Sequence, residues 1–168
     1  FEANFNFFQD VISTAGYTAS TREEYKKMFH LSMKDVIKKI TKSKDKKEIK
    51  RIWELGKFKI NYPSELIKIP TNVEKTIREL SKSYFLGIVT SRVKGGLFKI
   101  KGVGVLEKYF KIVIYFEDTK KHKPHPEPLL LAAKKLGIKP NDAVYIGDAE
   151  SDIIAAKAAG MKIIMYSK

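Results

Sequence analysis

The sequence predicts an α/β protein, with a parallel sheet flanked by helices and a second, small all-helical domain. Three observations support this prediction. Apolar runs alternate with helical patterns after residue 70, whereas the apolar spacing before it is helical throughout. In addition, a chain of 168 residues can form one good core together with a small satellite domain.

The expected helical domain covers residues 1–69. Its first helix carries an apolar stripe and ends at Gly16. The segment TREE at residues 21–24 has the pattern of a capping box and begins a second helix, while Ser32 begins a third. A further helix carries Ile49 and Ile52. We expect a small bundle in which the aromatic residues of the first stripe form core rather than a binding surface.

The expected α/β domain covers residues 70–168. Each of its apolar strands follows a helical pattern, and Gly137 and Gly160 end two of the helices. This alternation predicts a Rossmann-like parallel sheet covered on both faces, with ligands at the carboxyl ends of its strands. The expected strands are 84–90, 111–116, 143–146 and 162–166, and the bounded helices are 73–81, 128–136 and 152–159.

The composition narrows the possible functions. The net charge is +14, but it comes mostly from lysines spread along the chain, and the densest run, 42–51, contains acidic residues. We therefore interpret this run as a solvated face and expect no specific nucleic-acid binding. No run of about 18 apolar residues predicts a membrane span. Zero cysteines fit a cytoplasmic protein. The oligomeric state is not predicted.

Polar residues follow three of the expected strands. Thr90 and Ser91 follow the first, Lys123 lies in the loop KHKPHPEP after the second, and Asp148 and Asp152 follow the third. Separately, each has a structural explanation as a helix cap or an exposed loop residue. Together they would meet at one edge of the sheet, where hydroxyl and ammonium groups suit a phosphoryl group and carboxylates suit Mg²⁺.

The pair Asp148 and Asp152 has two interpretations. Two carboxylates four residues apart repel each other unless a cation or a strong donor lies between them. Alternatively, Asp148 caps the helix that follows and Asp152 favours its N-terminus. The pair alone does not decide between them. His122 and His125, which flank Lys123, are interpreted as exposed loop residues.

Three segments resemble motifs of the haloacid dehalogenase-like (HAD) hydrolases, in particular the phosphoglycolate phosphatase-like branch with a helical cap. FLGIVTS is similar to the second motif, HKPHPEP to the third and GDAESD to the fourth, in the family's order and spacing. The resemblance covers almost the whole chain and implies a helical cap at 1–69 and a HAD-like core at 70–168. It further implies a phosphatase that hydrolyses a small phosphorylated metabolite with Mg²⁺.

The resemblance also assigns roles. Thr90 would bind the phosphoryl group through its hydroxyl, and Ser91 through its backbone amide. Lys123 would neutralise the phosphoryl charge, so that Lys123 and Thr90 are the expected catalytic residues. Asp148 would ligate Mg²⁺, and Asp152 would bind the metal or hold Lys123.

The family's first motif has no counterpart in this chain. It supplies the nucleophilic Asp on a strand that lies between those ending at Thr90 and Ile146. We therefore expect an aspartyl-phosphate to form on a residue outside this chain, and the printed chain alone to be inactive. The alternative is a non-catalytic phosphate-binding protein, a degenerate relative without the nucleophile.

Overall fold

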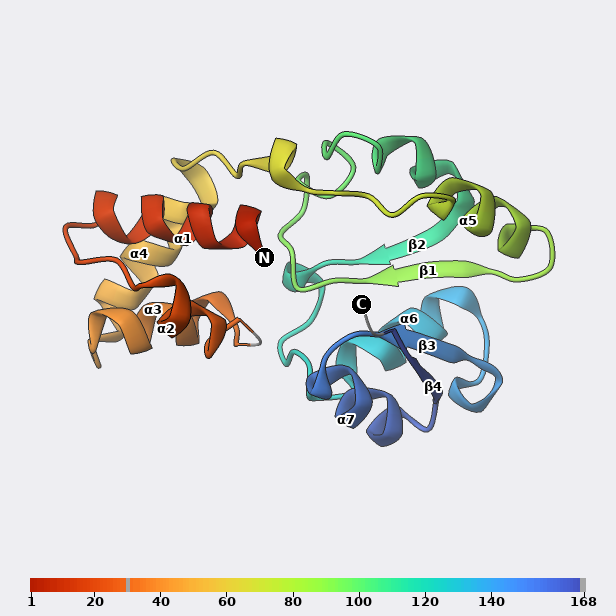
Figure 1. Ribbon diagram of the computed structural model, residues 1–168. Helices are drawn as coiled ribbons and strands as arrows, with labels where there is room; N and C mark the ends of the chain where they lie inside the picture. Colours follow the sequence, from red (N-terminus) through yellow and green to blue (C-terminus); the bar gives the residue numbers. More distant parts are fainter. Residues whose placement is uncertain (30, 167–168) are drawn as a thin grey trace. The chain divides into compact units, whose positions relative to one another are not determined.

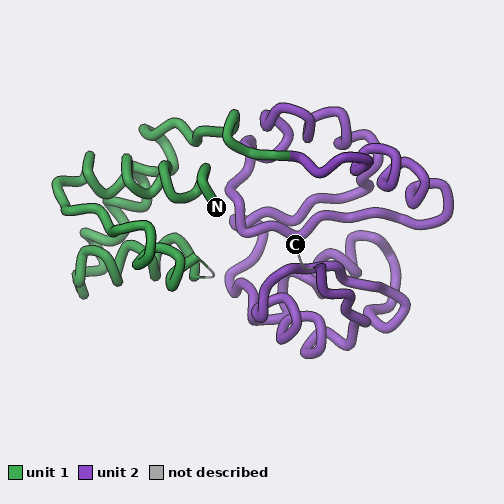
Figure 2. Tube along the Cα trace, in the orientation of Figure 1, with its two compact units in different colours: residues 1–68 green, residues 69–168 purple. Residues whose placement is uncertain are grey.

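The computed structural model describes residues 1–29 and 31–166. The chain divides into two compact units, Phe1–Lys68 and Ile69–Lys168 (Figure 2). The expected domain boundary lies one residue further along, between residues 69 and 70. Within the described ranges, no helix is both long and apolar enough to cross a membrane.

The regular elements of the first unit are all helices in its described residues (Figure 1). The Thr21 hydroxyl accepts a hydrogen bond from the Glu24 amide, and the Ser32 hydroxyl accepts one from Asp35, so both predicted helix starts are confirmed. Asp45 caps the last long helix by accepting from the Lys47 amide. The elements are α1 (Glu2–Thr14), α2 (Arg22–Lys26), α3 (Met33–Thr41), α4 (Lys46–Phe58) and the 3₁₀ helix η1 (Ser64–Leu66).

Apolar residues of α1, α3 and α4 form the core of this unit. Ile37 and Ile52 are completely buried between the helices. The aromatic stripe of α1 joins this packing through Phe8, which is buried beside Tyr25, whereas Phe1 is 37% exposed. Most of the stripe is therefore core, as predicted.

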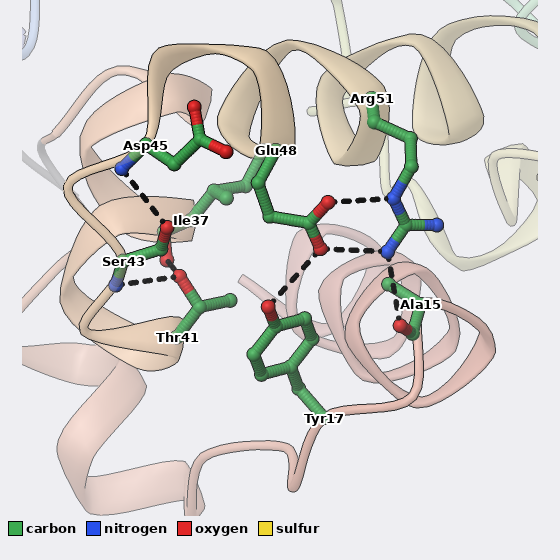
Figure 3. A network of polar contacts seen from close by, with 8 residues as sticks. All are labelled: Ala15, Tyr17, Ile37, Thr41, Ser43, Asp45, Glu48 and Arg51. Carbon is green, nitrogen blue, oxygen red and sulfur yellow. Dashed lines mark hydrogen bonds and ion pairs between the residues drawn. The ribbon is translucent and has the colours of Figure 1, made fainter.

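A polar network connects α4 with the end of α1 and with Tyr17 beyond it (Figure 3). The Arg51 guanidinium donates to both carboxylate oxygens of Glu48, at 2.8 and 2.7 Å, and to the Ala15 carbonyl at 3.2 Å. The Tyr17 hydroxyl donates to Glu48 at 3.0 Å. Residues of the basic run 42–51 thus connect α4 to the C-terminal end of α1.

The second unit contains two parallel strand pairs (Figure 1). β1 pairs with β2 and β3 pairs with β4, so the predicted parallel pairing is confirmed. In the described part of the chain, β1 and β3 are not hydrogen-bonded to each other. The elements are α5 (Val73–Ser81), β1 (Leu86–Val89), η2 (Gly104–Tyr109), β2 (Phe110–Ile114), η3 (Phe116–Asp118), α6 (Glu127–Leu136), η4 (Pro140–Asp142), β3 (Val144–Gly147), α7 (Glu150–Ala159) and β4 (Lys162–Met165).

Helices α6 and α7 cover one face of both strand pairs. Leu129 of α6 and the alanines of α7 form one cluster, against which Val89 of β1, Tyr145 of β3 and Ile163 of β4 pack. Gly137 and Gly160, at φ 69° and 72°, end the two helices as predicted.

The opposite face of the β3–β4 pair is not covered by described residues. Val144, Ile146 and Ile164 alternate with the buried positions and are 53%, 57% and 55% exposed. The prediction that the sheet is covered on both faces is therefore wrong for this pair, because no described helix packs on that side.

Candidate active site

The carboxylate of Asp152 is the centre of the site. It lies in the first turn of α7 and is only 3% exposed. One oxygen accepts from the backbone amides of Asp148 and Ala149, both at 3.1 Å. The other accepts from Lys123 Nζ at 2.6 Å and from the Tyr145 hydroxyl at 3.2 Å. Burial alone would raise the pKa of Asp152, but the hydrogen bonds and the Lys123 charge outweigh it and lower the pKa below its usual value.

Lys123 reaches Asp152 from the loop that precedes α6. Its ammonium also donates to the Tyr145 hydroxyl at 3.0 Å. Burial alone would lower the pKa of Lys123, but Tyr145 and Asp152 outweigh it, so the pKa is raised and the group stays charged. Glu127 holds the same loop, because its carboxylate accepts from the backbone amides of Lys120 and Lys121.

Thr90 and Ser91 lie in the turn after β1. The Thr90 amide donates to the Ile114 carbonyl at 2.9 Å, which extends the parallel pairing. The Thr90 hydroxyl accepts from the Arg92 amide at 3.1 Å, and no α-helix begins there, so Thr90 stabilises a turn rather than capping a helix. Thr90, Ser91 and Lys123 line one small hollow, together with Thr119 and His122. All three expected phosphate-binding residues therefore line the same hollow.

Asp148 and Asp152 have different surroundings. Asp148 is exposed at the end of β3, and its carboxylate makes no hydrogen bond or ion pair with the described residues. It does not cap α7, whose N-cap is Ala149. Asp152, by contrast, has four donors for its two oxygens. Asp148 is thus the carboxylate open to a cation, whereas Asp152 is engaged with Lys123 and the backbone.

The donor set fits Mg²⁺ through Asp148. In the described ranges, no three carboxylate or imidazole groups lie close enough to hold a metal by themselves. Mg²⁺, however, commonly keeps several waters and binds one or two carboxylates together with phosphate oxygens. A single carboxylate without a partner among the described residues, as Asp148 is, suits that kind of coordination.

Several residues at the site were missed or misinterpreted from the sequence. Tyr145 was interpreted only as a strand residue, although alternation along β3 puts it on the inward side with Gly147. His122 and His125 are half-buried rather than exposed. His122 stacks on Phe116 with ring centroids 3.8 Å apart, and His125 Nδ1 accepts from the Glu127 amide.

The fold and the site define a Rossmann-like α/β protein with a helical domain. A family model described as haloacid dehalogenase-like hydrolase matches residues 1–166. The chain belongs to this family, which confirms the resemblance seen in its three motifs.

Individual relatives agree with this assignment. The chain is 32% identical over 147 residues to pyrophosphatase PpaX of Bacillus cereus (strain AH820), covering 87% of this chain and 67% of that protein. It is similar to a HAD-superfamily hydrolase of subfamily IA from Geobacter sulfurreducens, with a TM-score of 0.69 and 27% identity over 98% of this chain and 79% of that one. CbbY from Rhodobacter sphaeroides, solved with xylulose-(1,5)bisphosphate, shares the fold with a TM-score of 0.81 at 19% identity, over 98% and 78% of the two chains.

Proposed function

We propose that this chain carries the phosphate-binding part of a Mg²⁺-dependent phosphatase that hydrolyses a small phosphorylated metabolite, such as a phosphoglycolate-type phosphomonoester. The observation that supports this best is the Lys123 ammonium. Its side chain is only 15% exposed, it is fixed by Asp152, and it lines the same hollow as Thr90 and Ser91. A charge held in this way offsets the charge of a phosphoryl group without reorganisation.

The side chains have separate roles in this proposal. The Thr90 hydroxyl and the Ser91 backbone amide bind phosphoryl oxygens, and Lys123 neutralises their charge. Asp148 holds Mg²⁺, which when bound neutralises further negative charge on the phosphoryl oxygens. Of the two roles considered for Asp152, binding metal or holding Lys123, its four donors favour the second.

The nucleophile is proposed to lie outside this chain. No Asp or Glu is among the described residues that line the hollow, so nothing there is placed for in-line attack. An Asp on a strand between β1 and β3 would form the aspartyl-phosphate.

The helical unit would be the cap domain, and the protein would be cytoplasmic. A non-catalytic phosphate-binding protein remains the second candidate, because the same hollow would serve it.

The test compares the full-length protein, with any segment that its gene encodes before residue 1, with the 168-residue chain. We expect Mg²⁺-dependent hydrolysis of p-nitrophenyl phosphate by the full-length protein and none by the shorter chain.

Asp148→Asn should lower turnover by roughly 100-fold or more, since a metal-ligating charge is lost. Asp142→Asn, an exposed carboxylate away from the site, is the control. Phosphate binding without turnover in the full-length protein would favour the second candidate.

A further inference from the structure

A three-membered hydrogen-bonded ring lies behind the hollow. Lys123 Nζ is 2.6 Å from Asp152 Oδ1 and 3.0 Å from the Tyr145 hydroxyl, and that hydroxyl is 3.2 Å from the same Asp152 oxygen. An ammonium only donates and a carboxylate only accepts. The phenol must therefore accept from Lys123 and donate to Asp152, which closes the ring with one consistent set of protons.

We propose that Tyr145 is a positioning residue, whose hydroxyl acts with Asp152 to fix the Lys123 ammonium at the wall of the hollow. The contribution of this position to catalysis rests on the proposed function, whereas the hydrogen bonds among the three residues do not. With two of its three N–H groups bound in the ring, Lys123 has one left to donate to a phosphoryl oxygen.

The position of the Tyr145 hydroxyl is itself fixed by packing. The ring lies against the cluster formed by Leu129, Ala155 and Ala156, all completely buried. A lysine side chain alone has many rotamers, and holding it in one of them costs conformational entropy. The Tyr145 hydroxyl on β3 and the Asp152 carboxylate on α7 together hold the Lys123 ammonium in one position.

A purely structural role would require only the ring of Tyr145. The variant Tyr145→Phe separates the two roles, because it keeps the ring and removes the oxygen. The matched control is Tyr84→Phe, which removes a hydroxyl from a side chain that is 65% exposed in the same unit.

The first readout is the lysine ammonium resonance of the ¹⁵N-lysine-labelled full-length protein. A held ammonium exchanges its protons slowly and is visible, whereas an exposed one is not. We expect one such resonance that disappears in Lys123→Met, is lost or strongly weakened in Tyr145→Phe, and is unchanged in Tyr84→Phe. A resonance unchanged in Tyr145→Phe, or a wild-type Lys123 that exchanges as fast as exposed lysines, would overturn the inference.

The second readout is kinetic. We expect Tyr145→Phe to lower kcat by roughly tenfold while KM changes by less than about threefold, because the two lost hydrogen bonds act through the position of the Lys123 charge. Equal losses in Tyr145→Phe and Tyr84→Phe would count against it. If the wild-type protein hydrolyses no phosphomonoester but the resonance is still lost in Tyr145→Phe, the proposed function fails and the positioning role stands.

Discussion

Gly147 at the end of β3 lies so close to Asp152 of α7 that it leaves no room for a side chain. A Cβ atom on Gly147 would lie 2.5 Å from Cβ of Asp152 and 2.6 Å from its Cγ and Oδ2. These distances are far inside van der Waals contact, and the Asp152 side chain cannot withdraw while its oxygens hold Lys123 and two backbone amides. The absence of a side chain at position 147 is therefore a condition for the Asp152 contacts.

We predict that Gly147→Ala displaces the Asp152 carboxylate and leaves the Lys123 charge without its partner. The free energy of unfolding should fall by about 2 kcal/mol or more, as for other overpacked sites with broken ion pairs, and inorganic phosphate should bind more weakly. Denaturant unfolding and calorimetric titration measure the two effects.

The control for this variant is Gly96→Ala. A Cβ atom there would meet nothing closer than the Val93 carbonyl oxygen at 3.9 Å, so little change is expected. If Gly147→Ala were as stable as Gly96→Ala and bound phosphate equally well, the close contact with Asp152 would have no energetic consequence.

At the scale of the element, Arg51 of α4 donates to the Ala15 carbonyl at the end of α1, and Glu48 of α4 holds both Arg51 and Tyr17. The hydrogen bonds from Arg51 lower the pKa of Glu48 to about 2, from an ordinary value of 4.5. A carboxyl group whose pKa is lower in the folded state stabilises that state above its unfolded pKa and loses the contribution as pH falls. The helical unit should therefore lose stability between about pH 4.5 and about pH 2.

We predict that Glu48→Gln removes this part of the pH dependence. The variant should be less stable than the wild type at pH 6, and the difference should shrink as the pH falls from 4.5 towards 2 and the wild-type carboxyl group takes up its proton. Thermal unfolding followed by far-ultraviolet circular dichroism measures the stability of both proteins at each pH. Glu54→Gln is the control, since Glu54 has a single ion pair with Lys50 at 3.6 Å. A difference that is constant over this pH range would contradict the assignment.

Features set by neighbouring residues could be predicted from the sequence. The caps at Thr21 and Ser32 and the helix stops at Gly137 and Gly160 depend on contacts within a few residues, and all four are present. The helix expected before the second strand is instead the 3₁₀ helix η2. A Cβ on its first residue, Gly104, would lie 2.7 Å from the Phe98 carbonyl oxygen, a contact from a preceding turn that no local pattern reveals.

The site could be predicted only in part, for a related reason. Thr90, Ser91 and Lys123 could be assigned to one edge of the sheet because strand ends meet there. Lys123 is expected as a partner of Asp152 only through the family resemblance, since it lies 29 residues away in the sequence. Tyr145, the other side-chain partner, is not expected, because it lies across the β3–α7 turn. Periodicity specifies the face on which Tyr145 lies, but not that its hydroxyl reaches another loop.

At the scale of the whole molecule, the charge of +14 is the most general property. In the first unit, lysines of α3, α4 and the turn between them line an open hollow. We predict that binding to duplex DNA is weak and independent of sequence, and falls steeply between 50 and 200 mM salt, because counterion release would supply nearly all of it. Fluorescence anisotropy with two unrelated duplexes measures this. Submicromolar, sequence-selective binding at physiological ionic strength would show that the lysines form a specific surface.

The separation of the site residues along the chain has a consequence for synthesis and folding. Thr90 and Lys123, the proposed donors to phosphate, come from two different segments, and Asp152, which holds Lys123, comes from a third. If the hollow binds phosphate as proposed, a chain still emerging from the ribosome cannot complete this site until α7 has been made and has docked. Because a ligand stabilises only the states that bind it, phosphate would then stabilise the chain only after α7 has docked and would leave every earlier intermediate unaffected.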